Sequence, residues 1–170
     1  MTEGSLYNFR NFFDKVNQGV ETNFETLVNL VICAEIEGEP RHELVLSIGI
    51  TPGILVRLGF NALRLVKAKT IGKMFFEHGL TQGLLEKIPA MLEAPQAIYR
   101  SDTHPTNMVV LTYELKAGSP IIIPIARDRQ IGRGPLVNEV VSMYAKTGPD
   151  PTGRWKSRGL LLWDKSGQKR

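Results

Sequence analysis

The sequence predicts an α+β fold, in which mainly helical segments come first and a block of β-strands follows. Two apolar runs rich in β-branched residues, Met108–Leu115 and Pro120–Ala126, have the length and composition of strands. Four residues that include Gly118 separate them, which is the spacing of a β-hairpin. Before Ala97, apolar residues recur mostly at helical spacing. The 170 residues are enough for one domain with a hydrophobic core.

Helices around two short strands are expected before residue 97. Amphipathic periodicity and helix-stopping glycines or prolines predict helices at residues 6–18, 23–37, 52–58, 71–78 and 80–92. Thr70 is a suitable N-cap for the helix at 71–78, and Gly79 is a suitable stop. The segments 43–48 and 63–67 have strand character.

The second half is expected to form the sheet and one further helix. A strand at Ala97–Tyr99 precedes the hairpin, and a basic glycine loop at Arg127–Gly134 follows it. Pro135–Lys146 is predicted to be a helix, because proline suits its first position and the valines at 137, 140 and 141 share one face. Residues 148–153 are expected to be a loop, and Leu160–Trp163 a last strand.

The charge of the chain is unevenly distributed. The net charge is +4, but the segment from Arg154 to Arg170 holds six Lys or Arg against one Asp, so residues 1–153 carry about −1. A basic end on a nearly neutral body suits a phosphate-rich partner, and it equally suits a solvated tail.

The cysteine content and the hydropathy favour a protein that stays in a reducing cytoplasm. Cys33 is the single cysteine, which excludes an internal disulfide, and its apolar neighbours predict a buried, inert thiol. The sequence contains no run of about 18 apolar residues, so no membrane insertion is expected. Charged residues and asparagines interrupt the N-terminal apolar run, which is unlike a signal peptide.

The sequence lacks the short motifs of phosphate loops, dinucleotide sites and zinc sites. The histidines His42, His78 and His104 are widely spaced, so we expect neither a metal nor another cofactor.

A set of cationic and hydrogen-bonding residues remains. Lys69 and Lys73 lie four residues apart, and His78 lies at the end of the same predicted helix, where the helix dipole favours its charged form. The second half contributes Arg127, Arg129, Asn138, Ser142, Tyr144 and Lys146. Cleavage of RNA through its 2′-hydroxyl needs an acid, a base and cations but no metal, and these side chains supply them. Taken singly, each is better explained as a surface residue or a local cap.

The order of several motifs resembles a known family. They are Ile48-Gly-Ile-Thr-Pro-Gly-Ile-Leu55, Ile71-Gly-Lys-Met-Phe-Phe-Glu-His-Gly79, Ile88-Pro-Ala-Met-Leu-Glu-Ala-Pro95, Ile98-Tyr-Arg-Ser101, the hairpin Val109–Ile125, Val137-Asn-Glu-Val-Val-Ser-Met-Tyr-Ala-Lys146 and Gly159-Leu-Leu-Leu-Trp163. Together they resemble the C-terminal toxin-type domain of phage MuF proteins, within the barnase–EndoU–colicin–RelE-like nuclease group. The resemblance covers about residues 44–165.

This resemblance implies N-terminal helices packed on a mainly antiparallel four-stranded sheet, and a metal-independent ribonuclease activity. We divide the chain into a helical extension at 1–40, a nuclease-like domain at 41–165 and a basic tail at 166–170. The family's polar motif positions correspond to Lys73, His78, Asn138, Ser142, Tyr144 and Lys146. One departure is Ala145, where the family pattern leads us to expect glycine.

The functional hypothesis is a ribonuclease-like toxin of a phage, plasmid or other mobile element. Its catalytic residues would be Lys73, His78, Ser142, Tyr144 and Lys146, and its substrate contacts Arg127, Arg129, Asn138 and Arg154. The expected partners are RNA or another phosphate-rich ligand, and an immunity or target protein. Two alternatives stay open: a non-catalytic protein that inhibits a conjugation or phage component, and a protein that binds nucleic acid without cleaving it.

Overall fold

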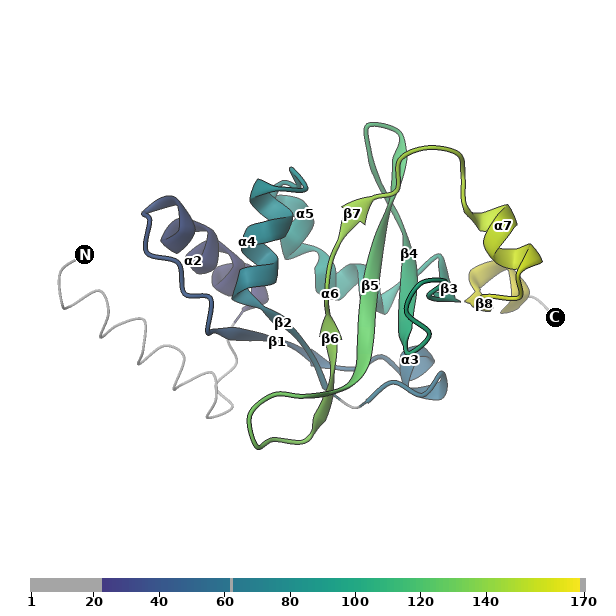
Figure 1. The fold of residues 1–170 in the computed structure, drawn as a ribbon, viewed down its shortest axis with the longest axis horizontal. Helices are drawn as coiled ribbons and strands as arrows, with labels where there is room; N and C mark the ends of the chain where they lie inside the picture. The colour runs from purple at the N-terminus through teal and green to yellow at the C-terminus, as the bar shows by residue number, and fades with distance from the viewer. Residues whose placement is uncertain (1–22, 62, 169–170) are drawn as a thin grey trace.

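The computed structural model describes residues 23–61 and 63–168, and Figure 1 shows how their helices and strands are arranged. The helices are α2 (Phe24–Ile36), α3 (Gly53–Arg57), α4 (Ala68–Phe76), α5 (Gln82–Glu86), α6 (Ile88–Glu93), α7 (Thr152–Ser157) and the 3-10 helix η1 (Lys165–Gln168). The strands are β1 (Val45–Ile50), β2 (Leu63–Lys67), β3 (Ala97–Arg100), β4 (Asn107–Lys116), β5 (Ser119–Gln130), β6 (Leu136–Val140), β7 (Tyr144–Ala145) and β8 (Leu161–Asp164). The helix expected at 6–18 lies outside the described residues.

The strands form one eight-stranded sheet in the order β1-β2-β6-β5-β4-β3-β8, with β7 also paired to β5. Neighbours are antiparallel except β2 and β6, which are parallel. The α+β prediction is confirmed, whereas the four-stranded antiparallel sheet is wrong, because the sheet is larger and mixed. Strands β1 and β2 extend it through β6, and β8 extends it through β3, so the backbone groups of those strands find partners.

The central hairpin is confirmed. Lys116 pairs with Ser119, which leaves a two-residue turn of Ala117 and Gly118. Both turn residues have positive φ, at 50° and 77°, as a type I′ turn requires. Such a turn matches the twist of the flanking strands, so β4 and β5 continue as the long centre of the sheet.

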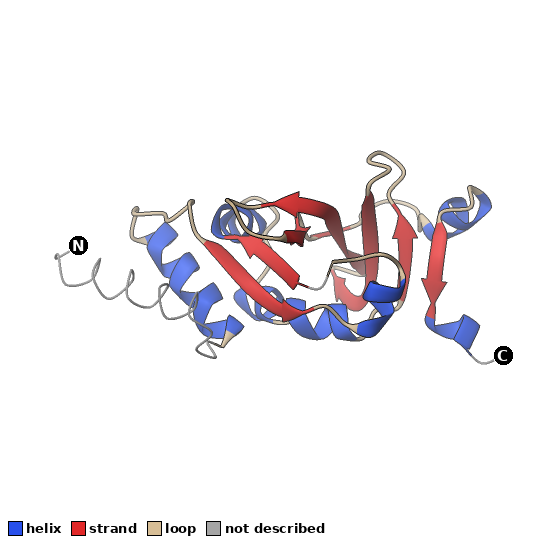
Figure 2. Cartoon of the chain, turned by 90° about the horizontal axis from the view of Figure 1, so that it is seen from below, coloured by secondary structure: helices blue, strands red, loops and turns tan. Residues whose placement is uncertain are grey.

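The two faces of the sheet pack into separate cores. On β5, Ile121, Ile123 and Ile125 join the larger core, to which α2, α4, α5 and α6 contribute their apolar sides. The alternate residue Ile122 joins a smaller core on the opposite face, together with Tyr99 and Trp155 of α7. Both views show α2 at one end of the molecule and α7 with β8 at the other (Figures 1 and 2).

The predicted helix Pro135–Lys146 is wrong, since this stretch forms β6 and β7. Val137 pairs with Arg129 of β5, and Val140 pairs with both Ile125 of β5 and Val66 of β2. These β-branched residues therefore sit on a central strand with hydrogen-bonded neighbours on both sides, which an isolated helix cannot offer.

Smaller corrections concern the ends of elements. The basic loop begins later than expected, because β5 continues to Gln130, and the expected helix 80–92 is two short helices. α4 begins at Ala68, ahead of Thr70, and no side chain caps its start. The helix α7 occupies the end of the loop expected at 148–153 and the start of the basic segment from Arg154.

Cys33 was expected to be buried, but it is exposed on α2. The helical period turns Val31, Ile32 and Ala34 inward and leaves Cys33 outward, with its Sγ atom 3.8 Å from Asn29 Oδ1. The proposed boundary between a helical extension and a nuclease-like domain at residue 40 stays a prediction. α2, which lies before that boundary, contributes to the larger core. In the described ranges, no helix is long and apolar enough to cross a bilayer.

Candidate functional site

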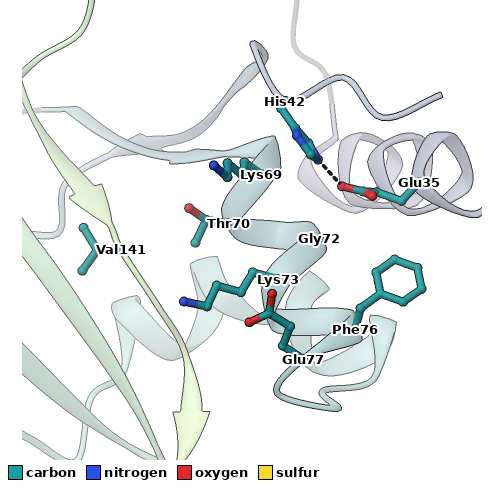
Figure 3. Close-up of a pocket in the computed structure, with 9 residues that line it drawn as sticks. All are labelled: Glu35, His42, Lys69, Thr70, Gly72, Lys73, Phe76, Glu77 and Val141. Atoms are coloured by element: carbon teal, nitrogen blue, oxygen red, sulfur yellow. Dashed lines mark hydrogen bonds and ion pairs between the residues drawn. The ribbon is translucent and has the colours of Figure 1, made fainter. Parts of the chain in front are cut away.

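A groove of about 480 Å³ lies between α4 and the segment that follows β6 (Figure 3). α4 directs Ala68, Ile71 and Met74 into the core, so its polar side borders the groove. The residues that line it are Glu35, His42, Lys69, Thr70, Gly72, Lys73, Phe76, Glu77 and Val141.

Lys69 and Lys73 form a cationic pair on the wall of the groove. Their four-residue separation places them on the same side of α4, and both side chains reach toward the segment that carries Val141 (Figure 3). Both are exposed, and neither has an ion pair with a residue in 23–61 or 63–168. Lys69 also lies in the first turn, where the helix dipole is positive. This wall of the groove therefore attracts anions.

Carboxylates also line the groove. Glu35 Oε1 lies 2.8 Å from His42 Nε2, and Glu77 lies beside Lys73 on α4 (Figure 3). Gly72 allows α2 to approach, because a Cβ at this position would overlap the carboxylate of Glu35. The negative side chains thus limit anion binding to the part of the groove that faces Val141.

His78 lies where the chain leaves α4 and is held by two hydrogen bonds. Its Nδ1 atom lies 2.8 Å from the carbonyl oxygen of Met143, and its own carbonyl oxygen accepts a bond from Lys116 Nζ at 2.8 Å. Because a carbonyl only accepts, Nδ1 carries the proton and Nε2 of the neutral ring is left as the base. The ring also meets Tyr144 edge-on, with 5.9 Å between ring centroids.

Residues 141–146 form an extended segment that faces α4 across the groove at Val141. Its backbone is fixed to β5, because Val141 N donates to Pro124 O and Lys146 N donates to Pro120 O. Val141 lines the groove, whereas Ser142 and Lys146 are half-buried on the same segment and do not line it. The structure therefore brings α4 and this segment together at two points, Lys73 near Val141 and His78 at Met143.

Comparison with known proteins places this arrangement in a family. Residues 69–168, from the first turn of α4 through η1, match the family described as Phage MuF-C-terminal domain, and this is more than half of the chain. The chain belongs to the phage MuF C-terminal domain family. No curated protein and no solved structure matches it.

Asn138 of this MuF C-terminal domain lies away from the groove and is only 1% exposed. Its Oδ1 accepts from Asn61 N at 2.8 Å, and its Nδ2 donates to Asn61 O at 2.7 Å and Thr51 Oγ1 at 3.1 Å. The amide is thus fully used in joining β6 to the chain before β2. Its contacts are those of a structural residue.

The three arginines expected to bind substrate are also distributed over other parts of the MuF C-terminal domain. Arg129 pairs with the buried Glu139 at 3.1 Å. Arg127 is half-buried, and its Nη1 lies against Gly59. Arg154 lies on α7, 3.9 Å from Asp102. None of the three lines the groove.

The altered position Ala145 lies within β7 and pairs with Ile121. It is not among the described residues with positive φ, so the strand holds an alanine here without backbone strain. Across residues 23–61 and 63–168, no group of three or more His, Cys, Asp or Glu is arranged to hold a metal ion.

Lys116 is a site residue that the sequence did not single out. It ends β4 at the hairpin turn and reaches the carbonyl of His78, 38 residues earlier in the chain. No local pattern links these residues, because the contact forms only when the fold brings the chain after α4 to the end of the hairpin.

Proposed function

We propose that the MuF C-terminal domain binds RNA in the groove beside α4 and cleaves it by metal-independent transesterification. The observation that carries this proposal is that the unpaired Lys69 and Lys73 of α4 line the groove, while His78 follows two residues beyond the end of α4 and has its ring oriented by the Met143 carbonyl. His78 itself does not line the groove. An oriented imidazole can act as a base, and the two cations can hold a phosphate in the groove that begins at the preceding helix.

In the proposed reaction, Nε2 of His78 takes the proton of a 2′-hydroxyl. The 2′-oxygen then bonds to phosphorus and the bond to the 5′-oxygen breaks, leaving a 2′,3′-cyclic phosphate. The departing oxygen takes a proton from water. Lys73 and Lys69 neutralise the negative charge that develops on the non-bridging phosphate oxygens, and electrostatic stabilisation of this kind is often the largest contribution to catalysis.

Residues of the segment 141–146 would complete the site. Tyr144 packs against the His78 ring and limits its rotation. Ser142 and Lys146 lie on the same segment and are proposed to contact the phosphate when RNA occupies the groove. The predicted substrate contacts receive no role in this groove, because Arg129, Asn138 and Arg154 make contacts elsewhere and Arg127 does not line it.

The test is cleavage of a labelled single-stranded RNA by the full chain in the presence of a chelator. We expect products that end in a 2′,3′-cyclic phosphate, and no product from the same sequence in DNA, which lacks the 2′-hydroxyl. His104→Ala is the matched control for His78→Ala, since His104 lies in the exposed loop before β4. Equal cleavage by both variants would exclude His78 from the reaction.

A second candidate function is protein binding without catalysis, as in an inhibitor of a conjugation or phage component. Phe76 favours it, because this side chain lines the groove and is 54% exposed. Expression in cells separates the two functions. A ribonuclease toxin should arrest growth unless an immunity protein is present, and His78→Ala should relieve the arrest. A binding protein should be tolerated, and its activity should depend on Phe76.

A further inference from the structure

A second cavity lies at the other end of the molecule, beside α7 and β8. Its volume is about 230 Å³, and Tyr99, Tyr113, Lys156, Asp164 and Lys165 are among the residues that line it. Tyr99 belongs to the smaller core, on the face of the sheet opposite α4. The cavity is therefore separate from the groove of the proposed ribonuclease site.

Tyr99 is the buried polar group of this cavity. Its side chain is 2% exposed, and its hydroxyl has no hydrogen-bond partner among the residues that the structure describes. Burial raises the pKa of this phenol, and the nearby carboxylates of Asp164 and Asp150 raise it further. The hydroxyl is not among the fully buried polar atoms that lack a partner, and Tyr99 lines the cavity, so the hydroxyl can donate to a ligand there.

Asp164 adds a hydrogen-bond acceptor with one oxygen still available. Its Oδ1 accepts from Ser166 Oγ at 2.6 Å and from Gly167 N at 2.7 Å. These two bonds lower the pKa of Asp164, which therefore stays ionised at neutral pH. Its Oδ2 has no hydrogen-bond partner within the described ranges, so it can accept from a ligand N–H.

The mouth of the cavity carries an aromatic ring and two ammonium groups. Tyr113 is 54% exposed, and Lys165 Nζ lies 5.5 Å from the centroid of its ring. This distance is near the outer limit of about 6 Å for a cation–π contact, so the ammonium can move to a stronger partner at little cost. Lys156 has no ion pair within 23–61 or 63–168. The mouth therefore offers one stacking surface and cations for a phosphate.

The size of the cavity limits the ligand. It is smaller than the roughly 300–1,000 Å³ of pockets that enclose a drug-sized ligand. A single planar ring can enter, while an attached sugar and phosphate stay outside near the lysines.

We propose that this cavity binds one nucleotide of a single-stranded nucleic acid, with the base between Tyr113 and Asp164 and the phosphate at Lys156 and Lys165. Aromatic stacking together with lysines along the backbone is the general mode of single-strand binding. The free oxygen of Asp164 accepts from the amino group of guanine, adenine or cytosine. The N3–H donor of uracil lies between two carbonyl oxygens, which repel a carboxylate, so uracil binds more weakly.

This site does not depend on RNA cleavage, and binding alone tests it. The full chain is titrated with the four 5′-ribonucleotides and with inorganic phosphate, and amide NMR shifts locate the contact. We expect shifts at Tyr99, Tyr113 and Ser166, and about tenfold weaker binding of the uridine nucleotide. Shifts confined to α4, or phosphate binding as tight as that of the nucleotides, would overturn the proposal.

The variant Asp164→Asn tests most directly whether Asp164 selects the base. The asparagine oxygen can keep the bonds from Ser166 and Gly167, which turns its NH₂ group toward the ligand as a donor. At position 4 uracil presents a carbonyl oxygen where cytosine presents an amino group, so uracil should then bind better than cytosine. An unchanged order of bases would contradict the role of Asp164.

Surface variants test the same proposal with little risk to folding. Tyr113→Ala should weaken nucleotide binding about tenfold through lost stacking, whereas Tyr113→Phe should not. Lys156→Gln with Lys165→Gln should abolish the advantage of a nucleotide over its nucleoside, while Arg57→Gln, exposed on α3, should preserve it. Equal affinities across these variants would exclude the cavity as the binding site.

Discussion

The Nδ1 atom of His78 lies 2.8 Å from the carbonyl oxygen of Met143. This bond joins the end of α4 to the extended segment between β6 and β7, 65 residues later in the chain. It fixes the tautomer of the neutral imidazole and directs Nε2 away from Met143. The bond therefore fixes the histidine that follows α4, while the groove lysines lie on α4 itself.

His78→Asn separates orientation from proton transfer. The amide of asparagine can still donate to the Met143 carbonyl, but it cannot act as a base. We expect cleavage to fall about 10²–10⁴-fold, the usual contribution of one proton-transfer group, with little loss of stability. Single-turnover cleavage of RNA and thermal unfolding measure the two effects, and His104→Asn is the control. Wild-type cleavage by His78→Asn would remove His78 from the mechanism.

Lys116→Met tests whether the second bond to His78 positions it. Methionine keeps the length of the side chain but cannot donate to the His78 carbonyl. Small displacements of a reacting group cost up to about 100-fold in rate, so we expect kcat to fall with little change in KM.

The control for this variant is Lys87→Met, which removes an exposed ion pair with Glu114 on the same strand, β4. Both variants should lose about 1 kcal/mol of stability or less. A purely structural role for Lys116 would lower stability without changing kcat.

Local patterns predicted the parts of the fold that depend on local contacts. The hairpin was predictable because Ala117-Gly118 suits its turn and the flanking runs are β-branched. The helix predicted at Pro135–Lys146 failed because β6 is defined by its partners β2 and β5, which lie far from it in sequence. The spacing of the valines alone cannot distinguish a helix from a buried central strand.

In the candidate site, too, local contacts could be predicted from the sequence and long-range contacts could not. The spacing of Lys69 and Lys73 predicted their common side on α4. The partner of His78 was not predictable, because it is a backbone oxygen that any residue could supply. Asn138 was expected to bind substrate, but its polar amide is used to join chain segments inside the protein.

Asn138→Ala should therefore act on stability. It removes the partners of Asn61 N, Asn61 O and Thr51 Oγ1 in a buried position, and each unpaired group costs about 1–3 kcal/mol. We expect a loss of about 3 kcal/mol in the free energy of unfolding, measured with urea. Asn29→Ala on the exposed side of α2 should change it by less than about 0.5 kcal/mol. Lost RNA binding at full stability would instead support a substrate contact.

Asp150 should contribute to the decrease in folding stability at acid pH. Its carboxylate accepts from Thr152 N at 2.9 Å at the start of α7, and this bond lowers the pKa of Asp150. Because the folded-state pKa lies below the unfolded one, the stabilisation is present above the unfolded value and is lost as pH falls through the folded value.

Asp150→Ala should accordingly lower stability near pH 7 by about 1 kcal/mol or less, the usual effect of one lost hydrogen bond, and by much less near pH 2. Asp150→Asn keeps an acceptor that does not titrate, so it should retain stability but lose this pH dependence. Thermal unfolding at both pH values measures the difference. A constant deficit of Asp150→Ala at all pH values would contradict the assignment.

The unpaired lysines of the groove make a prediction about salt. Each contact between a lysine and a phosphate of single-stranded RNA contributes about 0.7 to the slope of log K against log salt concentration. Lys69→Gln and Lys73→Gln should each reduce that slope by about this amount, measured with the His78→Asn protein so that the RNA stays intact. Arg57→Gln should leave the slope unchanged, because Arg57 lies on α3 and does not line the groove. Should the lysine variants weaken binding with the slope unaltered, their role would be to support the helix, and the phosphate would lie elsewhere.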